Sequence, residues 1–72
     1  MMEVPEAAVI TRGQMEIAFV LEQGRARMRL VRTGQRDGGR VTILSGLDAG
    51  ETLLLAPEPG LRDGDPVQSS SH

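Results

Sequence analysis

The 72-residue chain contains no cysteine, lysine, tryptophan or tyrosine, and phenylalanine occurs once, at Phe19. Without cysteine no disulfide can staple the fold. The single histidine, His72, is the last residue, so the chain lacks the set of nitrogen and sulfur ligands that a structural zinc ion needs. One aromatic residue also argues against a stacking platform for single-stranded nucleic acid.

Charge of one sign is not concentrated either. Eight arginines face ten carboxylates, which gives a formal net charge of −2, and a mildly acidic chain without a basic block is a poor phosphate binder. No hydrophobic run approaches the roughly 20 residues that span a bilayer. The first six residues carry two acids and no positive charge, so we expect no secretory signal in them.

The length predicts one small domain, because a typical domain has about twice as many residues. Nine glycines divide the chain into pieces of roughly six to ten residues, and no piece carries a long helical stripe. We therefore expect an all-β fold, a small antiparallel β-roll or barrel of about five or six short strands. The expected strands cover residues 7–11, 14–22, 25–33, 40–44, 52–55 and 66–68, with one helical turn at 47–50.

The first hairpin is the best-constrained prediction. A two-residue loop at Gln23-Gly24 pairs Glu22 with Arg25, and the pairing continues to Glu16 opposite Val31. A shift by one residue would set apolar side chains against arginines along the whole ladder. In the preferred register one face is apolar and holds Ile17, Phe19, Leu21, Ala26, Met28 and Leu30. The other is mixed and charged and holds Glu16, Ala18, Val20, Glu22, Arg25, Arg27 and Arg29.

A second hairpin is predicted at Asp37-Gly38-Gly39, where loops of two and of three residues fit equally well. Apolar residues on both faces of 41–44 indicate a strand covered on both sides. Pro57 and Pro59 mark a loop, and Pro66 restricts the last strand to an edge. Residues 69–72 have nothing to bury and are expected to form a disordered tail or remnant.

The order of these features resembles a known family. Val4-Pro5 comes first, then the two hairpin strands around Gly24, then Leu44-Ser45-Gly46-Leu47-Asp48-Ala49-Gly50-Glu51, and about ten residues later Leu61-Arg62-Asp63-Gly64. This is similar to the C-terminal, membrane-proximal segment of the periplasmic adaptor subunits, or membrane fusion proteins, of tripartite efflux pumps of the resistance–nodulation–division class. The resemblance covers residues 4–68, so residues 1–68 are expected to be one such domain.

The resemblance implies a non-enzymatic domain that docks on the periplasmic part of an inner-membrane efflux transporter and helps couple it to an outer-membrane channel. Neighbouring adaptor protomers are further partners. The location is periplasmic, with association to the inner membrane through parts of a longer chain. In the family, strand material from the N-terminal end completes this domain, so we expect an open sheet edge, and with it marginal stability or self-association.

The candidate partner contacts are Arg25, Arg27, Arg29 and Arg32. The first three recur at period two along one strand face, which suits recognition of an acidic patch on the transporter. A solvated sheet face that discourages aggregation explains the same pattern. Glu16 and Glu22 share that face and are expected to pair with the arginines for at most about 1 kcal/mol each if exposed.

Other chemistry-bearing residues favour structural roles. Thioethers suit soft Cu(I), but Met15 and Met28 are expected to fill the core, and Met1 and Met2 to mark a start. The acids around Gly64 lack the spacing of a calcium loop and indicate a turn. Ser45 has no histidine within reach, so no catalytic site, metal or cofactor is expected.

Two alternatives stay open. One is a small nucleic-acid-binding barrel that uses the same arginines and would bind with steep salt dependence. The other is an autonomous β module unrelated to efflux, for which these turns are generic.

Overall fold

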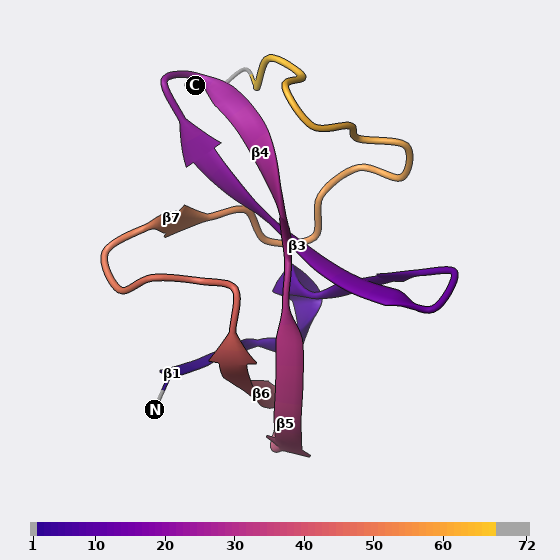
Figure 1. Cartoon of the computed structure of the whole chain (residues 1–72), viewed down its shortest axis with the longest axis vertical. Helices are drawn as coiled ribbons and strands as arrows, with labels where there is room; N and C mark the ends of the chain where they lie inside the picture. The colour runs from indigo at the N-terminus through magenta and orange to yellow at the C-terminus, as the bar shows by residue number, and fades with distance from the viewer. Residues whose placement is uncertain (1, 68–72) are drawn as a thin grey trace.

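The computed structural model describes residues 2–67, which fold into two antiparallel sheets with almost no helix (Figure 1). The expected all-β class is confirmed. No helix in the described range is long and apolar enough to cross a membrane. In chain order the elements are β1 (Met2–Pro5), the 3₁₀ turn η1 (Glu6–Ala8), β2 (Ile10–Arg12), β3 (Met15–Glu22), β4 (Arg25–Leu30), β5 (Arg32–Asp37), β6 (Arg40–Ser45) and β7 (Thr52–Leu53).

The β3–β4 hairpin has the register that the sequence predicts, from Glu22 opposite Arg25 to Ile17 opposite Leu30. Gln23 and Gly24 both have positive φ, 53° and 76°. These values suit a primed two-residue turn, whose twist matches that of the flanking strands. The prediction from apolar alternation and one glycine is therefore confirmed pair by pair.

Strand β3 is the centre of its sheet. One edge pairs with β4, and the other pairs first with β2 and then with β7. The expectation that its charged face is solvated is wrong in the middle of the strand, where Ala18 and Val20 are as buried as Ile17 and Phe19. The reason is that both faces are covered: Leu54, Leu61 and Val67 pack against the cluster of Ile17 and Phe19, and on the other face Val20 lines a small hollow together with Val4 and Leu47.

The other sheet has the order β1-β6-β5 and occupies the lower part of Figure 1. Its core consists of Val4, Val41 and Ile43, with Leu47 and Leu53 packed against them. The β5–β6 hairpin closes through Gly38 and Gly39, both at positive φ, with Asp37 opposite Arg40. The two-residue loop is thus the one that forms. The register then shifts twice along β5, at 32/33 and between 33 and 36.

Two local expectations are wrong. The helical turn expected at 47–50 is an irregular turn, because Gly46 and Gly50 adopt positive φ values that a helix cannot contain. A 3₁₀ turn forms instead at the start of the strand expected over 7–11, where Val9 donates to the Glu6 carbonyl and Ala8 is fully buried. Strand β1 was not expected, because four residues ending in proline give too short an alternation.

The strand expected over 25–33 is divided at Val31, where the chain passes from one sheet to the other. Val31 is buried, and Gly46 lies so close to this bend that a β-carbon on it would overlap the Leu30 carbonyl oxygen. The last expected strand is reduced to a single bridge between Arg25 and Pro66. Its final residue, Gln68, and the expected tail at 69–72 lie outside the described residues.

The sheet edges are partly protected. The Ala26 N–H donates to the Asp65 carbonyl, and the Gly64 N–H donates to the Ala26 carbonyl, so the loop before the C-terminus covers the start of the outer edge of β4. In the other sheet β1 and β5 are the edge strands. β1 ends in Pro5, and β5 is bulged and charged, two devices that discourage further pairing. That a strand from elsewhere completes the domain stays a prediction.

Candidate functional site

The arginine row of β4 forms as the register requires, with Arg25, Arg27 and Arg29 on one face of the strand. The Glu22 carboxylate lies 3.7 Å from the Arg27 Nε and 3.7 Å from the Arg29 Nη2. Arg25 has no carboxylate partner within residues 2–67 and donates to the Gly64 carbonyl at 2.9 Å. The row is therefore half-exposed, and its cations already have partners on the same chain.

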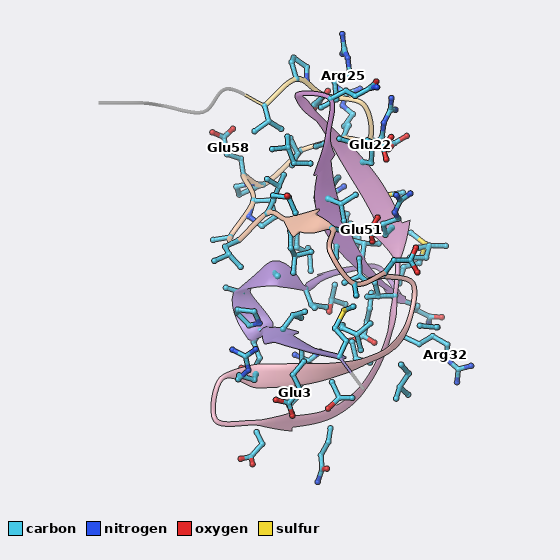
Figure 2. All side chains as sticks on the ribbon, turned by 90° about the vertical axis from the view of Figure 1, so that its left-hand side faces the viewer. Glu3, Glu22, Arg25, Arg32, Glu51 and Glu58 are labelled. Carbon is cyan, nitrogen blue, oxygen red and sulfur yellow. The ribbon has the colours of Figure 1, made fainter. Side chains whose placement is uncertain are left out.

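Arg29 is the most firmly held member of this row. Its Nη2 lies 3.1 Å from the Glu51 Oε2, and the other Glu51 oxygen accepts the Asp48 N–H at 2.8 Å. The hydrogen bond from the Asp48 N–H, and to a smaller extent the one from Arg29, holds the pKa of Glu51 below its usual 4.5. Figure 2 places Glu51 beside the sheet, midway along the molecule. This carboxylate ties the 46–51 loop to β4.

Arg32 does not belong to the row. It lies on β5, beyond the bend at Val31, and Figure 2 shows it well separated from Arg25 and Glu22. Within residues 2–67 its guanidinium makes no ion pair or hydrogen bond. It lines a shallow groove of about 310 Å³ together with Met15 and Leu30, which are 48% and 60% exposed. The expected set of four arginines is therefore one row of three and one separate cation.

This groove was missed by the sequence reasoning. Met15 was assigned to the core and Leu30 to the buried face of the hairpin, and both are exposed. Met28 was assigned to the core as well and is 36% exposed. The groove exists because the strand ends at Val31 and the chain bends there, which brings Arg32 to the same groove as Met15. No local sequence signal marks this bend. Arginine and methionine are both enriched at protein–protein interfaces, so this groove is a candidate binding surface.

Three other arginines, Arg12, Arg36 and Arg40, fasten the fold. The Arg12 Nη2 donates to the Leu61 carbonyl at 2.8 Å, and its guanidinium lies 5.5 Å from the centre of the Phe19 ring. Arg36 pairs with Glu16 at 2.8 Å and Arg40 with Glu3 at 3.7 Å. These side chains are structural, since each connects segments far apart in the chain.

The acidic residues also serve the backbone. The Asp63 Oδ1 accepts the Met28 N–H, and the Asp65 Oδ2 accepts the Arg62 N–H, both at 2.9 Å. Asp63 and Gly64 form the expected turn, with Gly64 at a φ of 89°. Among the residues that the structure describes, no three His, Cys, Asp or Glu side chains gather into a metal site. What the surface offers is exposed arginine and apolar side chains, which suit binding to another macromolecule.

The fold defines a small all-β domain of two antiparallel sheets. Residues 1–69 match the family model described as the C-terminal permuted SH3-like domain of YknX. The match covers nearly the whole chain, so the protein belongs to this family, an efflux adaptor or membrane fusion protein family. No curated protein and no solved structure matched the chain.

Proposed function

We propose that this domain is a non-enzymatic docking module of an efflux adaptor. It binds the periplasmic part of an inner-membrane transporter, next to neighbouring adaptor copies, and helps to couple the transporter to an outer-membrane channel. The observation that carries the proposal is the family match over residues 1–69. The resistance–nodulation–division class of the transporter is proposed from the sequence resemblance alone.

The β4 row is the surface that we propose for the transporter. Arg25, Arg27 and Arg29 present three cations along one strand, where the neighbouring β3 supplies Glu22. Exposed ion pairs of this kind contribute less than about 1 kcal/mol, so a partner carboxylate can replace Glu22 at small cost. Such charged surfaces act mainly on the association rate and on the choice of partner. An acidic patch on the transporter is the partner that fits.

Site-specific photo-crosslinking in cells that produce the parent adaptor tests this proposal. A photoreactive residue at Arg27 should capture an inner-membrane transporter, identified by mass spectrometry, and the same residue at exposed Thr11, on β2, should not. Arg27→Glu in the parent adaptor should lower transporter-dependent efflux without changing the amount of adaptor. Capture of no transporter, or equal capture from Thr11, would contradict the proposal. Salt-sensitive binding of an oligonucleotide to the purified chain would favour the nucleic-acid alternative.

A further inference from the structure

Arg32, Met15 and Leu30 form what we call the arginine groove. The two apolar side chains are 48% and 60% exposed, and Arg32 has no ion pair or hydrogen bond anywhere in residues 2–67. Glu16 also lines the groove, but its carboxylate is occupied by the Thr33 hydroxyl and by Arg36, each at 2.8 Å. The groove therefore offers apolar surface and one positive charge that its own side chains do not neutralise.

A second apolar surface, with a negative charge in place of the positive one, lies on the loop after β7. Leu55 is 58% exposed, and the exposed Glu58 makes no side-chain hydrogen bond or ion pair within the described part of the chain. We call these two residues the acidic rim, because both line the edge of an apolar cavity of about 670 Å³. The Ala56 N–H donates to the Ala7 carbonyl, and the Leu61 N–H donates to the Glu58 carbonyl, so the loop has a defined shape.

The arginine groove and the acidic rim cannot meet within one molecule. Figure 2 shows Arg32 and Glu58 on opposite sides of the domain, with β3 and β4 between them. Each surface combines an exposed leucine with one charge that has no side-chain partner among residues 2–67, and the two charges are opposite. They are complementary to each other, and they can come together only when two copies of the chain meet.

We infer that the acidic rim of one copy docks in the arginine groove of the next, with Leu55 against Met15 and Leu30 and Glu58 beside Arg32. The contact is head-to-tail, so each copy keeps one free surface of each kind, and repetition closes a ring or extends a row. The inference rests on the part of the proposed function that places neighbouring adaptor copies side by side. It leaves the β4 row free for the transporter.

Three other charged side chains, Arg27, Arg29 and Glu3, fit this role less well. Arg27 and Arg29 must first release Glu22 or Glu51, and Glu3 is already beside Arg40. Pro57 and Pro59 flank Glu58 and restrict the loop before it binds, which lowers the entropy lost on association. The contact joins two side chains of one copy to three of the next, so it is smaller than a standard interface of about 800 Å² per partner. Association of isolated domains is therefore weak, and a covalent trap is the suitable assay.

The absence of cysteine makes disulfide trapping clean. Gln14→Cys places a thiol beside the arginine groove and Ala56→Cys places one beside the acidic rim, while Arg32 and Glu58 stay intact. An equal mixture of the two variants is oxidised under mild conditions, and the yield of the mixed disulfide dimer is measured. The matched control is an equal mixture of Gln23→Cys and Ala56→Cys. The yield should exceed that of the control at least about fivefold, which corresponds to a preference of about 1 kcal/mol. Gln23 is an exposed residue at the opposite end of the hairpin.

Charge reversal completes the test. Adding Arg32→Glu to the groove variant, or Glu58→Arg to the rim variant, should reduce the trapped dimer to the control level, and adding both should restore it. All positions are exposed, and circular dichroism will verify that each variant folds. Dimer yields that do not exceed the Gln23 control, or that ignore the charge reversals, would overturn the inference. The assay contains no transporter, so its failure leaves the docking proposal for the β4 row intact, and failure of the Arg27 crosslink leaves this inference intact.

Discussion

The two hairpins of this domain are built from strands of similar length, yet they differ in how their register is determined. The β3–β4 hairpin keeps one register over six residue pairs. The β5–β6 hairpin begins with an equally tight two-residue loop and shifts register twice. β3 contains four consecutive buried residues, whereas β5 reads Arg-Thr-Gly-Gln-Arg-Asp and has none.

The difference shows that a tight turn starts a hairpin and that burial keeps it in register. A slip of β3 by one residue would remove Ile17 and Phe19 from the cluster that they form with Ala26 and would set them beside the arginines of β4. A slip of β5 exposes nothing apolar, so bulges cost little there. β5 is held instead by polar contacts, of which those from Glu16 to Thr33 and Arg36 are the shortest.

The largest predicted effect separates the two hairpins directly. Phe19 is fully buried in β3, and Phe19→Ala should cost about 3–5 kcal/mol, which is most of the stability of a domain this small. Leu44 in β6 is 58% exposed, and Leu44→Ala should cost less than about 0.5 kcal/mol. Urea unfolding followed by circular dichroism measures both. Equal losses would mean that Leu44 is as buried as Phe19, which contradicts the structure.

The next effect concerns the junction of the hairpins. Gly46 has a φ of 107°, and a methyl group there would overlap the Leu30 carbonyl oxygen and lie 2.9 Å from the Val31 α-carbon. Gly46→Ala should therefore cost at least about 2 kcal/mol in unfolding free energy. Gly50 has a φ of 90° with no atom within 4 Å of the added methyl, so Gly50→Ala is the control and should cost about 1 kcal/mol. A smaller loss for Gly46→Ala than for Gly50→Ala would show that the junction yields.

The two hairpins also differ in how well the sequence predicted them. The alternation from Glu16 to Val31 determined the first register completely, because one pairing alone separates apolar from charged side chains. The second hairpin was predicted from its glycines, but its loop length stayed open because β5 has no apolar residue to decide it. The bend at Val31 has no local signal: it depends on Gly46, fifteen residues away in the chain.

The candidate site was predictable only where it lies on a regular strand. The period-two arginines place Arg25, Arg27 and Arg29 on one face, as the structure has them. Arg32 was predicted to belong to the same surface because it follows these residues in the sequence. The bend at Val31 separates it from them. The arginine groove was not predictable, because it joins Met15 to Leu30 and Arg32 across the break between the sheets.

A milder variant sharpens the comparison at β5. Glu16→Gln weakens the bonds from Thr33 and Arg36 and should cost about 1 kcal/mol in unfolding free energy. Hydrogen exchange should speed up at the β5–β6 amides and stay unchanged in the β3–β4 ladder. The Glu22 side chain is 54% exposed and its carboxylate lies 3.7 Å from its partners, so Glu22→Gln should change neither. Faster exchange throughout both hairpins would contradict a local role for Glu16.

The smallest effect depends on pH and concerns the tie between the hairpins. The Asp48 N–H and Arg29 lower the pKa of Glu51 in the folded chain, so its carboxylate adds stability above the usual 4.5. This contribution is lost as the pH falls through the lowered pKa. Glu51→Gln should therefore be less stable than the parent by under about 1 kcal/mol at pH 7, and this deficit should shrink as the pH falls below 4.5, as urea titrations at pH 7 and at pH 3 will measure. The Glu58 carboxylate has no intramolecular partner among residues 2–67, so Glu58→Gln should have the same unfolding free energy as the parent at both pH values. A Glu51→Gln deficit that persists in acid would mean that the side chain acts through packing, and that charge does not fasten the loop at 46–51 to the first hairpin.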